Sequence, residues 1–331
     1  MKIFDDKYII LTGGAGFIGS AVLEELNNLN IDNIIVVDDL GCDERWKNLV
    51  KKRFIDFVHK DDLFDWLQGR EDDIEAFIHL GACSSTVEKD ADYLMENNTH
   101  FSMELAQYAL ENEHRFIYAS SAATYGDGKL GFSDAHEQLG QFAPLNMYGY
   151  SKHLFDLWLQ REKLLDKVTG LKFFNVFGPG ELHKGRMASA VVKMTADVQA
   201  KGEISLFKSN DPANFADGEQ VRDFIYVKDV TKMIVQFLQK DLFGIYNVGR
   251  GEGSTWNQLA NAVFKALDVA PKIKYIDMPE DLIGKYQNYT VADMKKSIRA
   301  NLHMPTYSLD EGVRDYVRGH LLDQKSLLAC V

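Results

Sequence analysis

The sequence predicts an α/β protein with a doubly wound parallel sheet and a second, smaller α/β domain. Two observations predict it: short apolar runs alternate with amphipathic segments in the first half of the 331 residues, and Gly, Asp or Ser borders the runs. Helices that cross over between parallel strands produce this alternation, because each helix buries one face against the sheet. In chain order the expected strands are 8–12, 33–38, 76–80, 116–120 and 172–177, with helices over 20–29 and 98–112.

The pattern changes after Phe177. Pro179 stands between two glycines and predicts a loop. The Ser254 hydroxyl is expected to cap a later helix, and an apolar stripe predicts a helix in the tail. In chain order we expect a loop over 178–186, a helix over 187–200, a loop over 208–220, a strand over 223–230, a helix over 231–240, the helix from Ser254, and a tail helix near 309–322 that aligns Val313, Tyr316, Val317 and Leu321.

Composition excludes several classes of protein. The net charge of −12 argues against an overall basic footprint for nucleic acid, although local basic pockets for anionic ligands stay possible, and 20 Phe, 14 Tyr and 4 Trp exclude a disordered coil. No apolar run approaches the ~18 residues of a membrane helix, and the start lacks the apolar core of a signal peptide, so we expect a cytoplasmic protein. Cys42, Cys83 and Cys330 are odd in number and widely spaced, which argues against a disulfide framework. The nine histidines lack ligand spacing, so no metal is expected.

Three glycines follow the first expected strand. Gly13, Gly16 and Gly19 form a G-x-x-G-x-x-G pattern before the first helix, and Asp38 ends the second strand 19 residues after Gly19. Glycines permit a tight turn and let the backbone approach a pyrophosphate, which the helix N-terminus binds through its free N–H groups. This register favours a Rossmann dinucleotide site over a turn without a ligand. The expected domains are 1–176 for the dinucleotide, rejoined by 224–248, and a discontinuous 177–331 for the substrate.

The choice between two dinucleotides stays open at this point. Asp38 can bond the 2′-hydroxyl of an adenosine ribose, which favours NAD. Arg45 and Lys60 lie in neighbouring segments and can meet a 2′-phosphate, which favours NADP. On the sequence alone, solvated surface explains both basic residues better.

Tyr148 and Lys152 stand four residues apart and share one face of an expected helix. A phenol with an ordinary pKa of ~10 is a poor base at neutral pH. The lysine cation and the positive nicotinamide ring favour the phenolate, which makes proton transfer with a substrate hydroxyl practical. Ser121, after a strand, is expected to orient that hydroxyl. The glycine turn, the serine and the Tyr–Lys pair in this order are jointly specific.

With these motifs the chain resembles the extended short-chain dehydrogenase/reductase (NAD-dependent epimerase/dehydratase) family over nearly its whole length. It is most similar to the branch of nucleotide-sugar epimerases that act on ADP-heptose. The segments that carry the resemblance are GACSSTVEKD (81–90), SSAATYG (120–126), PLNMYGYSK (144–152), FNVFGPGELHKGRMAS (174–189), VRDFIYVKD (221–229) and GKYQNYTVAD (284–293). The resemblance implies an isomerase that uses bound NADP, oxidises C6″ transiently and supplies heptose for lipopolysaccharide core. It also implies a homo-oligomer, a pentamer in this family.

The resemblance further implies roles for individual residues. Tyr148 and Lys184 are the expected acid/base residues, supported by Lys152 and Ser121. The residues expected at the cofactor are Gly13, Gly16, Phe17, Ile18, Gly19, Asp38, Asp39, Arg45, Lys60, Leu80, Gly81, Ala82, Cys83, Ser84, Asn97, Lys152, Val176 and Lys184. Those expected to hold the nucleotide-sugar are Ser84, Ser121, Asn175, Arg186, Lys193, Phe207, Lys208, Ser209, Asn210, Arg222 and Tyr286.

The chemistry of epimerisation explains why two proton acceptors are useful. A carbinol C–H is not acidic, so inversion proceeds by hydride removal to a ketone and hydride return to its other face. The hydroxyl points in different directions in the two epimers, which suits Tyr148 on one side and Lys184 on the other. A neutral fraction of Lys184 is required, and a charged His183, Arg186 and the cofactor ring are expected to lower its pKa. Without the resemblance, a phosphate-binding lysine explains Lys184 better.

Some positions depart from the family pattern and leave the substrate contacts open. Arg186 replaces a small hydroxyl residue, Leu80 replaces an acid, Lys172-Phe173 replaces Arg-Tyr, and the 211–221 segment is longer.

Three other functions share part of this pattern. A 4-epimerase shares the catalytic triad, here Ser121, Tyr148 and Lys152, but this function leaves the segment HKG (183–185) unexplained. A 4,6-dehydratase carries an Asp-Glu pair where this chain has Ala122-Ala123. A regulator that binds NADP without turnover usually lacks the Tyr–Lys pair.

Overall fold

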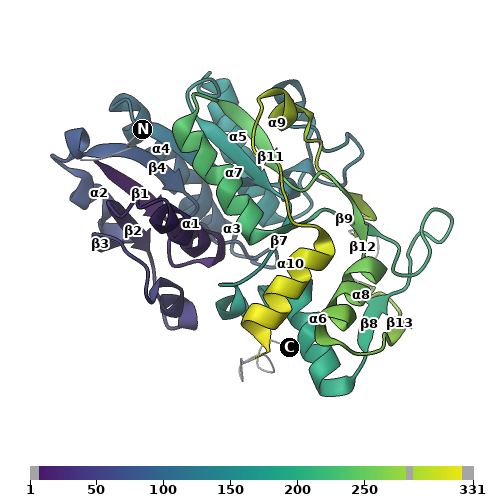
Figure 1. The fold of residues 1–331 in the computed structure, drawn as a ribbon. Coiled ribbons are helices and arrows are strands. Elements are labelled where there is room, and N and C mark those ends of the chain that lie inside the picture. The colour runs from purple at the N-terminus through teal and green to yellow at the C-terminus, as the bar shows by residue number, and fades with distance from the viewer. Residues whose placement is uncertain (1–6, 281–285, 323–331) are drawn as a thin grey trace.

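The main sheet confirms the expected doubly wound arrangement. The computed structural model describes residues 7–280 and 286–322, so Cys330 and the first two residues of the 284–293 segment lie outside it. Within the described residues, seven parallel strands are ordered β11-β6-β5-β4-β1-β2-β3 (Figure 1). In chain order these are β1 (Tyr8–Thr12), β2 (Ile34–Asp38), β3 (Asp56–His59), β4 (Ile74–His79), β5 (Arg115–Ser121), β6 (Thr169–Phe173) and β11 (Gly244–Val248).

Helices cover both faces of this sheet. On one face α1 packs against α7, a helix from the second half of the chain, and on the other lie α4 and α5 (Figure 1). The helices are α1 (Phe17–Asn28), α2 (Leu63–Leu67), α3 (Ala91–Leu94), α4 (Phe101–Glu111), α5 (Met147–Arg161), α6 (Ala190–Lys201), α7 (Val227–Gln239), α8 (Trp256–Leu267), α9 (Lys295–Arg299) and α10 (Leu309–Tyr316). None of them is long and apolar enough to cross a membrane.

Smaller sheets lie outside the main sheet: β7 is at the centre of Figure 1, and the others are on the right, near α6 and α8. Their strands are β7 (Asn175–Phe177) with β10 (Phe224–Tyr226), β8 (Ile204–Phe207) with β13 (Ile273–Ile276), and β9 (Val221–Arg222) with β12 (Ser254–Thr255) and β14 (Tyr289–Thr290). A second apolar core lies between α6, α8 and α10.

Several expected strands differ from the structure by one or two residues at an end, and two differ by more. The run 172–177 is divided between β6 and β7, because the chain leaves the main sheet at Phe174, which is buried among Tyr125 and Phe132. The expected strand 223–230 is only β10, and α7 begins at Val227. Within α7, Asp229 faces inward and accepts hydrogen bonds from Thr306 and Tyr307.

The N-cap of α8 is Thr255, so the prediction of Ser254 was wrong by one residue. The Thr255 hydroxyl accepts a hydrogen bond from Gln258 N at 3.1 Å, and the Gln258 side chain accepts one from Thr255 N at 2.8 Å. This reciprocal capping box requires the cap to stand three residues before Gln258. Ser254 lies in β12, where its hydroxyl accepts a hydrogen bond from Arg250.

The tail helix is confirmed. Helix α10 continues as a π-helical turn (Val317–Leu321), and the expected stripe residues Val313, Tyr316, Val317 and Leu321 are all buried.

Lys172, at a position that departs from the family pattern, lies on β6 and forms a buried ion pair. Its ammonium is 2.6 Å from a carboxylate oxygen of Asp156 on α5, and both side chains are fully buried. Tyr118 and Ser120 donate hydrogen bonds to the same carboxylate at 2.9 and 2.8 Å. Lys172 also donates to Thr124. The pair therefore joins β6 to α5, the helix that carries Tyr148.

Replacing Asp156 by Ala is expected to destabilise the protein by ~3–5 kcal/mol, because it leaves the Lys172 cation buried without its partner. The free energy of unfolding from urea denaturation measures this loss. Asp197→Ala is the matched control, since Asp197 pairs with the exposed Lys201 on the surface of α6 and should cost far less. Equal stability losses in the two variants would contradict the structural role of the buried pair.

Candidate active site

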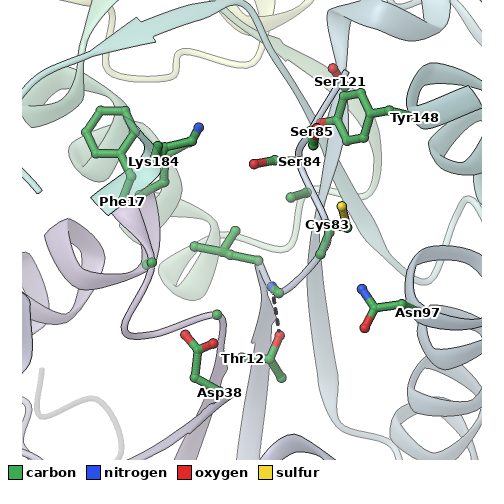
Figure 2. Close-up of a pocket in the computed structure, with 18 of the residues that line it drawn as sticks. Thr12, Phe17, Asp38, Cys83, Ser84, Ser85, Asn97, Ser121, Tyr148 and Lys184 are labelled. Atoms are coloured by element: carbon green, nitrogen blue, oxygen red, sulfur yellow. Dashed lines mark hydrogen bonds between the residues drawn. The ribbon is translucent and has the colours of Figure 1, made fainter. Parts of the chain in front are cut away.

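A cleft of about 540 Å³ opens at the carboxyl ends of the main-sheet strands. Its wall includes Thr12 at the end of β1, Asp38 at the end of β2 and Ser121 at the end of β5 (Figure 2). The strand order reverses between β1 and β4, which is where doubly wound sheets bind their ligands. Every residue predicted to bind the cofactor or to catalyse the reaction lines this cleft.

The glycine turn after β1 fits a dinucleotide pyrophosphate. Gly13 has a φ of +69°, and a Cβ there would lie 2.6 Å from Gly81 N. A Cβ on Gly19 would overlap the Gly13 carbonyl oxygen. Gly16 is the N-cap of α1 and brings no side chain over the N–H groups of the first turn. Only glycines permit this packing, and it leaves the positive end of α1 facing the cleft.

Carboxylates and bases meet at the end of the cleft near β2. Asp38 is 9% exposed and accepts a hydrogen bond from Ala15 N at 2.8 Å. Burial raises the pKa of Asp38, although the N–H donors of Ala15 and Asp39 oppose this rise. Arg45 contacts Asp43 through Nε and Nη2 at 3.0 and 2.8 Å, and lies 3.7 Å from Asp38. Arg45 and Lys60 therefore lie on the cleft wall, not on remote solvated surface.

A buried hydrogen-bond chain supports the loop after β4. Gly81 N donates to the Thr12 hydroxyl at 3.1 Å, and the Thr12 oxygen lies 2.7 Å from His79 Nδ1. His79 Nε2 lies 2.8 Å from the Ser102 hydroxyl, which donates to the Asn98 carbonyl. Burial lowers the pKa of His79 to about 3, so the ring is neutral and can accept at Nδ1 while donating from Nε2. This chain fixes the loop against the glycine turn.

Tyr148 lies on the cleft wall with Ser121 beside it (Figure 2). Both Tyr148 and Lys152 come from the first turns of α5, whose N-cap is Asn146. Burial raises the pKa of Tyr148, and a hydrogen bond with Ser121 only partly opposes it. Burial lowers the pKa of Lys152 to about 8, against the pull of Asp156. Burial is thus the larger effect on the pKa of Tyr148 in the protein alone, and the expectation that Lys152 and a nicotinamide ring together favour the phenolate stays a prediction.

Lys184 lies on the opposite side of the cleft from Tyr148 (Figure 2). It belongs to a 3-10 turn (Leu182–Met187), and its ammonium is 5.9 Å from the centre of the Phe17 ring. Burial lowers the pKa of Lys184, and the carboxylate of Glu181 opposes that shift. The lowered pKa of Lys184 agrees with the prediction. Its main cause in the protein alone is burial, and not the predicted charges of His183 and Arg186. Arg186 is exposed, and burial lowers the pKa of His183, which favours its neutral ring.

The predicted substrate-binding residues divide into two sets. Ser84 and Ser121 line the cleft, whereas the others lie outside its wall in the region of the smaller sheets. Arg222 there lies 4.9 Å from the Tyr286 ring and 5.8 Å from the Trp256 ring. The residues outside the wall are Asn175, Arg186, Lys193, Phe207, Lys208, Ser209, Asn210, Arg222 and Tyr286. Their contact with a substrate stays a prediction.

The sequence interpretation missed part of the wall. Those additional residues are Thr12, Val37, Asp43, Ser85, Tyr93, Phe101, Ala119, Ser120, Phe173, Phe174, His183 and Met187. Thr12 and Ser120 stand at strand ends, a signal that could have identified them. Among the described residues no cluster of three or more His, Cys, Asp or Glu side chains could hold a metal ion.

Comparison with known proteins connects this cleft to a family. Residues 9–249 match the NAD dependent epimerase/dehydratase family. The chain is 52% identical over 315 residues to ADP-L-glycero-D-manno-heptose-6-epimerase of Nitratidesulfovibrio vulgaris, covering 94% of this chain and 97% of that protein. It is 46% identical to the protein of that name from Fusobacterium nucleatum, covering 97% and 100%. The crystal structure of the Helicobacter pylori protein of that name matches with a TM-score of 0.79 at 26% identity, covering 96% and 99%.

Proposed function

The chain belongs to the NAD-dependent epimerase/dehydratase family, and from this premise we propose that it interconverts ADP-D-glycero- and ADP-L-glycero-D-manno-heptose by transient oxidation at C6″. It is an isomerase, since the relatives of highest identity given above are epimerases. The observation that carries the proposal is the placement of Tyr148 and Lys184 on opposite sides of the cleft that the glycine turn lines (Figure 2). We place the product in the supply of heptose for lipopolysaccharide core, and the enzyme in the cytoplasm.

The residues of the cleft would exchange a proton with the hydroxyl of each epimer, and exchange with water restores the two bases between turnovers. A bound nicotinamide dinucleotide supplies the group that accepts and returns the hydride. Tyr148 takes the hydroxyl proton of one epimer as the carbonyl forms, with Ser121 orienting the oxygen. Lys152 sits one turn along α5, where it would support Tyr148 and hold the ribose of a bound nicotinamide. Lys184 performs the matching proton transfer for the other epimer, whose hydroxyl points toward the opposite wall.

The direct test is incubation of the purified protein with ADP-D-glycero-D-manno-heptose and no added cofactor, followed by NMR and mass spectrometry. We expect the L-glycero epimer at unchanged mass. UDP-glucose is incubated in parallel, because inversion at C4 of that sugar alone would favour a 4-epimerase. A product lighter by one water would favour a dehydratase, and turnover of neither sugar would favour a regulator.

We propose that the retained cofactor is mostly NADP. Arg45 and Lys60 on the cleft wall support this, and the hydride returns in every turnover, so the cofactor need not leave. Nucleotide extracted from the denatured protein is expected to contain NADP in excess of NAD. Extraction of NAD alone would contradict the proposal and assign Asp38 to the ribose 2′-hydroxyl.

A double variant distinguishes the binding of NADP from the binding of NAD. Arg45→Ala combined with Lys60→Ala should weaken NADP binding by ~10-fold or more and leave NAD binding nearly unchanged, since only NADP carries the 2′-phosphate. Arg53→Ala is the control, because Arg53 is an exposed base that pairs with Asp32 away from the cleft.

We also propose a homo-oligomer, with five subunits as the expected number. Sedimentation velocity of the purified protein gives the mass of the assembly, and a monomer at micromolar concentration would contradict this.

A further inference from the structure

The loop that carries Lys184 is closed at its base by one buried carboxylate. The loop runs over 178–189, from the end of β7 to the start of α6. Glu181 is 2% exposed and accepts hydrogen bonds from Gly178 N at 3.2 Å and from the Ser189 hydroxyl at 2.7 Å. Its second oxygen accepts from Ser189 N at 2.5 Å. Because the donors stand at the first and last residues of the loop, this carboxylate holds the two ends together.

The same loop is also held to the glycine turn, through the side chain of Asn48. Asn48, in the 3-10 turn Glu44–Leu49, approaches two carbonyl oxygens through Nδ2: Ala15 O at 3.0 Å and Gly180 O at 2.9 Å. Ala15 belongs to the glycine turn, and Gly180 belongs to the loop. His183 Nδ1 lies 3.3 Å from the same Asn48 nitrogen. The loop is thus held to the part of the chain that cradles the pyrophosphate, although the two segments lie far apart in sequence.

Close packing accompanies these bonds. A Cβ on Gly180, whose φ is +98°, would lie 3.3 Å from Ser20 Oγ and 3.6 Å from Phe17 O, so the loop rests on the first turns of α1. Lys184 follows by four residues, and its backbone N–H donates to Glu181 O at 3.0 Å. The side chain of Lys184 then points into the cleft beside Phe17 (Figure 2).

We propose that Glu181 and Asn48 are positioning residues for the epimerisation: Glu181 sets the shape of the Lys184 loop, and Asn48 sets its place over the N-terminus of α1. Neither residue lines the cleft wall. The role of Lys184 as a proton acceptor rests on the proposed function, whereas the anchoring of the loop does not. Since the loop lies against the glycine turn, the same two anchors also slow the escape of a dinucleotide bound there.

Glu181→Gln is a sharp test because it keeps the size of the side chain. Each carboxylate oxygen faces at least one N–H or O–H donor. An amide NH₂ at either oxygen position therefore puts donor against donor and leaves a buried group unsatisfied. Asn48→Ala tests the second anchor and keeps the proposal testable if the first variant fails to fold. Glu203→Gln and Asn112→Ala are matched controls: Glu203 pairs with Lys272 on the surface, and the Asn112 side chain donates to the carbonyl of Tyr108 at the end of α4.

The readout that does not need activity is the rate at which an amine-acylating reagent modifies Lys184 in the protein as purified, followed by peptide mass spectrometry. We expect Glu181→Gln and Asn48→Ala to raise that rate by ~5-fold or more, with other lysines such as Lys265 unchanged. We also expect kcat for the nucleotide-sugar to fall by ~10-fold or more with little change in KM, because a displaced proton acceptor acts on the transition state. Release of the bound dinucleotide should be faster in Asn48→Ala.

The outcomes separate the two proposals. An unchanged Lys184 modification rate in both folded variants overturns the positioning role, whatever the wild-type protein catalyses. A raised rate in a protein that does not epimerise ADP-heptose overturns the proposed function and leaves the anchoring in place. A raised rate with unchanged kcat shows that loop anchoring does not serve catalysis, and this too overturns the proposal.

Discussion

Lys184→Met lowers kcat by ~10²-fold or more, with little change in KM, if two proton acceptors serve the two epimers. The physical reason is the geometry of the cleft: Tyr148 and Lys184 lie on opposite walls (Figure 2), and the hydroxyls of the two epimers point in different directions. Methionine keeps most of the length of lysine and removes only the amine. Steady-state kinetics with each epimer as the starting substrate measures the effect.

The same variant should retain the chemistry that Tyr148 serves alone. Oxidation or reduction of an aldehyde analogue of the sugar on the Tyr148 side is expected to proceed at a near-normal rate. Lys201→Met is the control, because Lys201 lies on the surface of α6 and pairs with Asp197. A Lys184→Met enzyme with normal kcat and a raised KM would return Lys184 to phosphate binding, the signature of lost uniform binding.

Tyr148→Phe lowers kcat by at least ~10²-fold and leaves the fold intact, since the ring stays and one general acid/base is lost. Both directions of the epimerisation should slow, because one epimer or the other must exchange its proton with the phenol. Circular dichroism and thermal unfolding check that the fold is unchanged. Tyr150→Phe is the matched control on the same helix, as Tyr150 is 45% exposed. Near-wild-type turnover in Tyr148→Phe would remove this residue from the mechanism.

Five strands of the main sheet were predicted because each is a short apolar run with its own boundary signal, whereas β3 and β11 were missed. The predicted run YIILT is β1 without error, and Asp38 ends β2 as expected. Phe174, by contrast, is apolar like its neighbours, so nothing local marks the change from β6 to β7. Ser254 and Thr255 are equally good capping residues in isolation. The choice between them depends on Gln258, whose side chain completes the box.

The cleft residues that belong to a local sequence motif were predicted, whereas residues that come together from distant segments were missed. Gly13, Tyr148 and Lys152 belong to local patterns with a stated chemistry. His79 and Ser102 form a pair only because β4 places them next to each other in the folded chain. Asn48 and Gly180 are 132 residues apart, and no local spacing relates them. The pKa of Lys184 likewise depends on burial, which the neighbouring residues in the sequence do not determine.

The order of the strands has a consequence for how the polypeptide is made. Strand β6 can pair with its outer neighbour β11 only after residues 244–248 have left the ribosome. In the same way, α1 can pack against α7 only after α7 has been synthesised. A nascent chain that ends at Phe177 therefore presents β6 as an open edge, with unpaired N–H and C=O groups along one side. The main sheet is therefore complete only after residues 244–248 have been made, and until then the outer side of β6 lacks its strand partner.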